Sequence, residues 1–241
     1  MLEARELVCG YREGVDILQG VTVRVEEDTI TSVIGANGSG KSTLLRCLFG
    51  LLPVRTGEIR FLQAALNDWT TERRKTAGMA YLPQHHSTFP QLTVEENLRL
   101  GGWLLRGDRP ELNRRMEGLY ELFPALAGRR HTRATLLSGG QLRMLALAKE
   151  LVVPPKLILV DEPSVGMAPN VANEMYAFLE RLPAEGVTVL LVDQNIADAV
   201  RLAKHVYMLG EGKVQRQGSG PWFVDHLDEV VADMLRGAPS N

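Results

Sequence analysis

Cysteine, aromatic residues and an excess of charge of either sign are all scarce in this chain of 241 residues. It has 2 cysteines, 6% aromatic residues, and 27 lysines and arginines against 29 aspartates and glutamates. Cys9 and Cys47 cannot build a disulfide framework, and neither stands in the spacing of a Cys/His metal site, so a reducing compartment is expected. The net charge of -2 supplies no basic field for a nucleic-acid backbone. We therefore expect no nucleic-acid partner.

Long apolar runs are also missing. Nowhere do about 18 apolar residues follow one another, and residues 1–14 contain acidic side chains without an apolar stretch. A signal peptide and a membrane-spanning helix are therefore not expected. Any role at a membrane would depend on a membrane-embedded partner.

The composition that is present, 45% hydrophobic and 23% charged, is that of an ordinary globular protein. A chain of this length lies between one and two domains at about 150 residues per domain, which favours one large, subdivided unit. Short β-branched runs alternate with helical patterns, which predicts a mostly parallel sheet with crossover helices. Strands are expected at Val21–Val25, Ile30–Ile34, Leu157–Val160 and Val187–Val192, and a hairpin at Met208–Gln215 turning at Gly210–Gly212.

Helical patterns follow the second strand and fill the middle of the chain. Apolar residues recur at helical spacing over Lys41–Leu52, where Pro53 ends the pattern. The segment Ser87–Leu151 lacks β-branched runs, which predicts a helical insertion. Thr93 and Glu96 fit a capping box that opens its first helix. A second, amphipathic helix is expected from the apolar residues Leu112, Met116, Leu119, Leu122 and Phe123.

The strongest local motif is Gly35–Ser42, which matches G-x-x-x-x-G-K-[ST] between an expected strand and an expected helix. Glycines let backbone N–H groups turn toward phosphate oxygens, and the helix N-terminus adds a positive dipole end. Lys41 would reach the β- and γ-phosphates, and Ser42 would hold Mg²⁺. The alternative, a glycine-rich turn that happens to precede Lys-Ser, is disfavoured by this context. The candidate nucleotide-binding residues here are Gly35, Asn37, Gly38, Ser39, Gly40, Lys41, Ser42 and Thr43.

Two adjacent carboxylates follow the apolar strand Leu157–Val160. Asp161 can fix Mg²⁺, and Glu162 can act as the base toward the water that attacks the γ-phosphate. Strands often end in acids, so this pair alone would be a weak signal. Behind a phosphate-binding loop it favours a catalytic site.

A second anion-binding helix start is expected at Leu137–Gln141, before a helix over Leu142–Leu151. Ser138 is placed as an N-cap, and Gly139 and Gly140 expose backbone N–H groups. Two phosphate-binding devices for one nucleotide are redundant in one site. One physical resolution is that the second device serves the ATP of a neighbouring subunit.

With these motifs in this order, the chain resembles the ATP-binding-cassette ATPases over nearly its whole length. The resemblance implies an α/β fold: a P-loop NTPase core with a mixed sheet, an N-terminal antiparallel β subdomain and an inserted α-helical subdomain. Residues 1–241 would form one domain, divided into 1–86, 87–151 and 152–241. It also implies a head-to-tail dimer, with ATP and Mg²⁺ held between the P-loop of one subunit and Ser138, Gly139, Gly140 and Gln141 of the other.

The resemblance assigns further roles residue by residue. Tyr11 would stack on adenine, although an exposed loop tyrosine is the alternative. Gln84 would contact Mg²⁺ or the attacking water, although a solvated amide is the alternative. Two positions depart from the family pattern: Ala168 replaces an aspartate, and Gln194 replaces the switch histidine. A glutamine can still donate to the γ-phosphate, but it cannot titrate near pH 7.

These departures, with Glu121–Pro124 and Leu92–Leu98, are similar to the cassettes of branched-chain amino-acid importers. The resemblance implies integral-membrane permease subunits, a second, non-identical ATPase subunit and, indirectly, an extracytoplasmic solute-binding protein. It implies a cytoplasmic location, peripheral on the inner face of the cell membrane. Related carriers take ureas and amides, so the cargo stays open.

Two other functions stay open at this point. A soluble, non-transport cassette ATPase is disfavoured because the chain holds one cassette, without a long coiled coil or a tandem copy. A degenerate partner cassette with weak hydrolysis is disfavoured by the presence of Lys41, Ser42, Asp161 and Glu162, but Gln194 and Ala168 keep it open.

Overall fold

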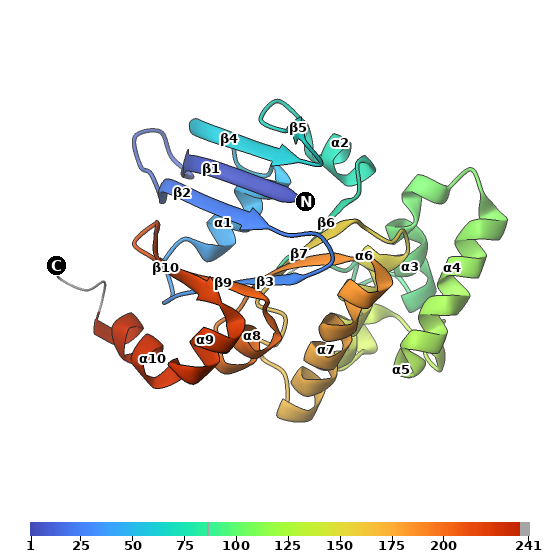
Figure 1. Ribbon diagram of the computed structural model, residues 1–241. Helices are drawn as coiled ribbons and strands as arrows, with labels where there is room; N and C mark the ends of the chain where they lie inside the picture. The colour runs from blue at the N-terminus through green and yellow to red at the C-terminus, as the bar shows by residue number, and fades with distance from the viewer. Residues whose placement is uncertain (86, 237–241) are drawn as a thin grey trace. The chain divides into compact units, whose positions relative to one another are not determined.

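The computed structural model describes residues 1–85 and 87–236, which form two compact units (Figure 1). Of the described residues, the core unit takes 1–81, 156–162 and 178–236, and the helical unit takes 82–85, 87–155 and 163–177. The helical unit thus takes in 163–177 in addition to the expected insertion. The expected division at 86 and 151 stays a prediction.

The core unit begins with an antiparallel sheet of four strands in the order β2-β1-β4-β5. In β2, the residues Val21, Val23 and Val25 are buried while Thr22 and Arg24 are exposed, which is the alternation expected of a half-buried strand. The expected N-terminal antiparallel sheet is confirmed. Its strands are β1 Leu2–Cys9, β2 Leu18–Val25, β4 Thr56–Phe61 and β5 Ala64–Ala65.

The second sheet is mixed and has the order β10-β9-β3-β8-β7-β6. Strand β3 pairs in parallel with β8 and β9, and β7 pairs in parallel with β8, whereas β10 runs antiparallel to β9. Every residue of β3, β7 and β8 is buried, as in parallel strands covered on both faces. The strands are β3 Ile30–Ile34, β6 Met79–Leu82, β7 Leu157–Asp161, β8 Thr188–Val192, β9 His205–Gly210 and β10 Lys213–Ser219.

Helices complete the core unit. Helix α1 lies between the two sheets in Figure 1, and its Leu44, Leu45 and Leu48 belong to one apolar core with residues of both sheets. Helices α8 and α9 cover the other face of the mixed sheet. The helices that lie wholly in the core unit are α1 Lys41–Phe49, α2 Thr71–Thr76, α8 Ile196–Leu202, α9 Gly220–Asp225 and α10 Leu227–Arg236, with the 3₁₀ turn η3 Leu182–Glu185.

Helix α1 ends at Phe49, three residues earlier than the expected Leu52, so that boundary was wrong. Gly50 adopts the left-handed conformation at φ 85°, and its N–H turns back to the Cys47 carbonyl. Such a C-terminal glycine stops a helix without help from proline. Pro53 therefore lies beyond the end of the helix.

The end of α1 is held by a buried arginine. The Arg74 side chain is 2% exposed, and its guanidinium donates to the carbonyls of Cys47 at 3.1 Å, Leu48 at 2.6 Å and Leu66 at 2.7 Å. Burial lowers the pKa of Arg74. Two of these carbonyls belong to the last turn of α1, where carbonyls lack the N–H partner four residues on that the helix interior supplies. Arg74 thus joins the end of α1 to the segment after β5.

The helical unit begins its helices where the capping pattern places them. Thr93 caps α3: the Glu96 N–H donates to its hydroxyl at 3.2 Å, and the Glu96 carboxylate accepts from the Thr93 N–H at 2.8 Å. The predicted capping box is confirmed. The helices of this unit are α3 Val94–Gly101, α4 Arg109–Leu122, α5 Pro124–Ala127 and α6 Gly139–Leu151, with the 3₁₀ turns η1 Trp103–Leu105 and η2 Ala134–Leu136. Helix α7, Pro169–Arg181, has residues in both units.

The amphipathic helix is α4, in which Leu112, Met116 and Leu119 are buried as expected. Leu122 is exposed, which corrects its place in the apolar stripe: α4 ends there, and Phe123 turns into the core as the C-terminal cap. Within residues 1–85 and 87–236, no helix combines the length and apolar character needed to span a bilayer.

Replacing Arg74 with methionine should lower the free energy of unfolding by about 2–4 kcal/mol, because buried carbonyls lose a charged donor. Urea unfolding of the purified chain measures this. Arg73→Met is the matched control: Arg73 is exposed on the same helix and lies over the Trp69 ring at 4.0 Å, so its loss should cost less than about 1 kcal/mol. Equal losses for the two variants would contradict the assigned role.

Candidate nucleotide-binding site

The loop between β3 and α1 has a backbone that only glycine adopts easily. Gly38 and Gly40 have φ of 82° and 105°, and Gly40 is the N-cap of α1. At Gly35, with φ 155°, a Cβ would lie 2.2 Å from the Leu209 carbonyl oxygen. The loop therefore presses against β9 at Gly35 and turns into the helix at Gly40.

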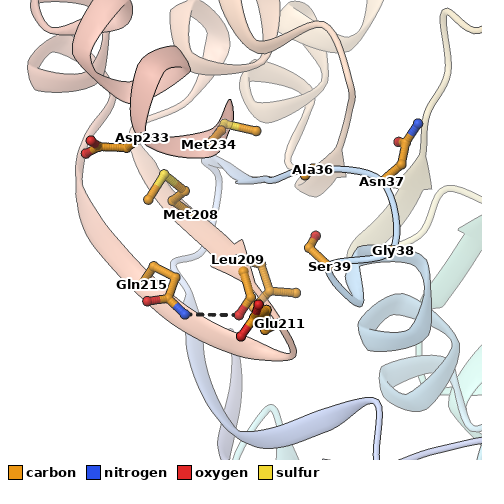
Figure 2. A pocket seen from close by; sticks show the side chains of 11 residues that line it. Ala36, Asn37, Gly38, Ser39, Met208, Leu209, Glu211, Gln215, Asp233 and Met234 are labelled. Carbon is orange, nitrogen blue, oxygen red and sulfur yellow. Dashed lines mark hydrogen bonds between the residues drawn. The ribbon is translucent and has the colours of Figure 1, made fainter. Parts of the chain in front are cut away.

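The turn between β9 and β10 is hydrogen-bonded to this loop. The Gly212 N–H donates to the Ser39 carbonyl at 3.0 Å. Figure 2 shows the loop residues 36–39 facing the β9–β10 turn, where Gln215 donates to the Gly210 carbonyl at 3.1 Å. A cavity of about 230 Å³ lies between the loop, this turn and α10. The predicted hairpin with its turn at 210–212 is confirmed, and its strands extend further than expected.

Lys41 is the first residue of α1 and is only 4% exposed. Its ammonium donates to the carbonyls of Gly35 at 2.8 Å and Ala36 at 3.1 Å. Burial lowers the pKa of Lys41, and the carboxylates of Glu162 and Asp161 oppose that shift. The ammonium is thus held inside the loop, next to the two carboxylates at the end of β7.

The Asp161 carboxylate accepts hydrogen bonds from two hydroxyl groups. The Ser42 hydroxyl donates to Oδ1 at 2.9 Å, and the Tyr81 hydroxyl donates to Oδ2 at 3.1 Å. Burial, followed by the Asp161 charge, raises the pKa of Tyr81, so it stays a neutral donor. Sequence reasoning missed Tyr81. The available signal was one hydroxyl in the otherwise apolar strand β6 just before Gln84.

Glu162 has a strained backbone and a buried side chain. Its φ of 45° is in the left-handed region, which is unfavourable for a residue with a Cβ, and the residue is 5% exposed. Its N–H donates to the Val192 carbonyl at 2.8 Å, and the Gln194 amide donates to Oε2 at 2.6 Å. Burial raises the pKa of Glu162, while the Gln194 hydrogen bond opposes the shift. Glu162 is therefore held by hydrogen bonds at both its backbone and its side chain.

Tyr11 lies at the edge of the core unit with 52% of its surface exposed. Its hydroxyl accepts from Arg46 at 2.7 Å and from Thr43 at 3.4 Å. The hydroxyl is anchored to α1, and the Arg46 guanidinium lies 5.9 Å from the centre of the ring, which is otherwise largely exposed. This geometry is compatible with both readings of Tyr11, the adenine platform and the exposed loop residue.

In the helical unit, α6 begins at Gly139 rather than at the expected Leu142, and Ser138 is its N-cap as predicted. A capping box fixes this start: the Ser138 N–H donates to the Gln141 side chain at 3.1 Å, and the Gln141 N–H donates to the Ser138 hydroxyl at 3.3 Å. The pattern Ser-x-x-Gln was the signal for it. At Gly139 a Cβ would meet no described atom within 4 Å, whereas at Gly140 it would lie 2.6 Å from Val171.

The expected site residues are thus divided between the two units. The core unit brings Lys41, Ser42, Asp161, Glu162 and Gln194 together through the contacts given above. It holds Tyr11, Gly35, Asn37, Gly38, Ser39, Gly40, Lys41, Ser42, Thr43, Asp161, Glu162 and Gln194; the helical unit holds Gln84, Ser138, Gly139, Gly140 and Gln141.

Comparison with known proteins agrees with this arrangement. Residues 18–165 match the ABC transporter family. The chain is 38% identical to the high-affinity branched-chain amino acid transport ATP-binding protein BraG of Pseudomonas aeruginosa, over 88% of this chain and 91% of that protein. It is 34% identical to the probable branched-chain amino acid transport ATP-binding protein LivF of Archaeoglobus fulgidus, over 94% and 95%.

The fold is also that of solved cassettes. The ADP conformation of an ATP-binding cassette of an ABC transporter superposes with a TM-score of 0.84 at 26% identity, over 98% of each chain. The fold, the nucleotide loop and the matches define an ATP-binding-cassette ATPase. The chain belongs to the ABC transporter family, and the fold implied by the sequence resemblance is confirmed.

Replacing Gly35 with alanine should weaken ATP binding at least about tenfold, because a Cβ there displaces the loop from β9. Titration of the purified chain with a fluorescent ATP analogue measures the affinity. Gly118→Ala is the control, since a Cβ at this α4 residue would meet no described atom within 4 Å; its affinity should stay within twofold of the wild type. Unchanged binding by Gly35→Ala would refute the role of this close approach.

Proposed function

We propose that this chain is the ATP-hydrolysing subunit of a membrane importer for branched-chain amino acids or related small amino acids and amides. The observation that carries the proposal is the group formed by Lys41, Ser42, Asp161, Glu162 and Gln194 at the carboxyl ends of β3, β7 and β8. The relatives' names support the class of cargo. ATP-dependent closure of two cassettes would drive transport.

Ser42 and Asp161 fit the Mg²⁺ that accompanies ATP. Ser42 Oγ and Asp161 Oδ1 are 2.9 Å apart. Neighbouring oxygens around an octahedral Mg²⁺, at metal distances of about 2.0–2.1 Å, are separated by about 2.9 Å. Both oxygens can therefore take adjacent positions around one ion, with Gln84 as a further proposed ligand. The ion would neutralise phosphate charge, and Lys41 would contact the β- and γ-phosphates.

Glu162 is the proposed general base. Its carboxylate lies beside Lys41 and Asp161, and the Gln194 amide fixes it by donating to Oε2. A fixed carboxylate can orient the attacking water and accept its proton. Gln194 would then position the base and donate to the γ-phosphate, and Gln84 would contact the same water.

The start of α6 is proposed to bind the ATP of a second cassette. The first N–H groups of a helix have no carbonyl partner one turn earlier, and they attract phosphate. The capping box uses the N–H groups of Ser138 and Gln141. Because Gly139 has no side chain, no Cβ covers the helix end at this position. A second, non-identical ATPase subunit would complete both sites, and Tyr11 would stack on adenine in the chain's own site.

The helical unit carries exposed apolar side chains on and around α3. Their exposed fractions are 51% for Phe89, 38% for Leu100, 60% for Trp103 and 39% for Leu104. Buried Asn97 of α3 binds both backbone groups of Phe89, so this segment lies against α3. Apolar surface of this kind marks a protein contact. We propose that a permease subunit covers it, which would place the chain at the cytoplasmic face of the membrane, with a solute-binding protein on the other side.

A second candidate is a cassette that binds ATP but hardly hydrolyses it. The short contact of 2.6 Å between Gln194 and Glu162 favours it, because one oxygen of the base is already occupied. The intact set of Lys41, Ser42 and Asp161 favours hydrolysis. Turnover in the assembled transporter separates the two candidates.

Replacing Glu162 with glutamine should reduce phosphate release by about 10²- to 10⁴-fold, because the amide cannot accept a proton. The measurement uses the transporter complex purified in detergent from membranes of the host. The affinity of the variant complex for a fluorescent ATP analogue should stay within twofold of the wild type. In the host, uptake of radiolabelled leucine should fall to that of a strain lacking the chain.

The control is Glu111→Gln, because the Glu111 carboxylate pairs with Arg114 and Arg115 on α4 and has no role in the proposed site. Its turnover should equal that of the wild type. Unchanged hydrolysis by Glu162→Gln would reject Glu162 as the base. An inactive wild-type site would favour the second candidate.

Trp103→Ser should leave binding of the ATP analogue unchanged and reduce the permease that copurifies with the chain at least about fivefold, because a central aromatic contact is lost. Quantitative immunoblotting of the affinity-purified complex measures this. Leu51→Ser removes an equally apolar side chain, 51% exposed, from the core unit and should retain the permease. Equal recovery with Trp103→Ser would reject this surface as the contact.

A further inference from the structure

Arg143 binds two segments of the helical unit that stand next to proposed catalytic residues in the chain. Its Nη1 donates to the carbonyls of Pro83 and Gln84, the latter at 3.2 Å, and its Nε donates to the carbonyl of Pro163 at 3.1 Å. Gln84 is a proposed ligand of Mg²⁺ or water, and Pro163 directly follows Glu162. All four residues belong to the helical unit.

The helix that carries Arg143 is the one whose start is proposed to bind a partner's ATP. Ser138 caps α6, and Arg143 lies little more than one turn further along. The hydrogen-bonded helix between them is short and stiff. A displacement of the Ser138 end therefore moves the Arg143 guanidinium and the carbonyls bound to it.

The two acceptor segments are restricted at the bound residues. Pro83 and Pro163 have their φ fixed near -65° by the ring, so ψ is the one soft backbone dihedral left to orient each carbonyl. An arginine fork can meet several carbonyls in one plane, which fixes their relative positions. The guanidinium is thus a rigid link between the segment after β6 and the segment after β7.

Open space beside this link leaves room for the segments to shift. A cavity of about 190 Å³ is lined by Gln84, Thr88, Gly139, Arg143 and Val165 together with neighbouring residues. These come from the same three parts of the chain: the loop after β6, the start of α6 and the segment before α7. Interiors without such space resist displacement. The link therefore has space in which a second arrangement can form.

We propose that Arg143 is a positioning residue for hydrolysis: it couples the start of α6 to the Gln84 loop and to the segment after Glu162. The inference rests on the proposed function. When the partner's ATP engages Ser138 and Gly139, the guanidinium brings the carbonyl of Gln84 and that of Pro163 into their hydrolytic positions together. Engagement of the partner's site thereby becomes a condition for turnover.

Arg143→Lys is the sharp test, because an ammonium keeps the charge but cannot present the same fork to two segments. In the purified transporter complex, kcat for ATP should fall at least about tenfold, while KM for ATP stays within twofold. Hydrogen exchange should show that ATP protects residues 83–85 and 163–168 in the wild type, and that this protection is lost in the variant. Arg115→Lys, which changes an arginine bound to Glu111 on α4, is the matched control and should match the wild type.

An unchanged kcat, or ATP-dependent protection that persists in both segments of Arg143→Lys, would overturn the proposal. So would a lowered melting temperature with faster exchange throughout the helical unit, since that result describes a purely structural side chain. A wild-type complex that binds ATP without hydrolysing it would instead overturn the proposed function, and this inference with it. A tenfold loss of kcat in Arg143→Lys at wild-type stability supports the coupling.

Discussion

Parallel pairing of three strands is the constraint on which the site depends. Strand β8 lies between β3 and β7, and its Val192 is paired with both Val33 and Asp161. The carboxyl ends of the three strands therefore reach one edge of the sheet at the same level. The phosphate loop follows β3, Glu162 follows β7, and Gln194 comes two residues after β8, so residues far apart in sequence meet without help from long loops.

Contacts between residues that are close in the sequence could be predicted, whereas side-chain contacts to distant backbone carbonyls could not. The glycine loop, the capping box at Thr93 and the strand that delivers Asp161 each need only neighbouring residues, and each leaves a pattern of residue types. Arg74 and Arg143 bind carbonyl groups, which every residue possesses, so no residue type marks the acceptors. The sequence showed Ser138 as a cap but not the return contact of Gln141, which moved the start of α6 by one turn.

The same reasoning explains which parts of the site were found. Lys41, Ser42, Asp161 and Glu162 lie in short motifs whose chemistry is read directly from the residue types. Tyr81 was missed because its strand is otherwise apolar and tyrosine is common in strands. Its hydroxyl nevertheless shares Asp161 with Ser42, so the proposed metal ligand is oriented by a residue from a strand with no motif of its own.

The left-handed backbone of Glu162 has a consequence for any attempt to stabilise this protein. Glycine suits a φ of 45° better than any residue with a Cβ. Glycine would also remove a buried carboxylate from beside Asp161. A screen that rewards heat resistance alone would thus favour loss of the proposed base. Thermostability and turnover are opposed at this one position, so a selection for either property must also measure the other.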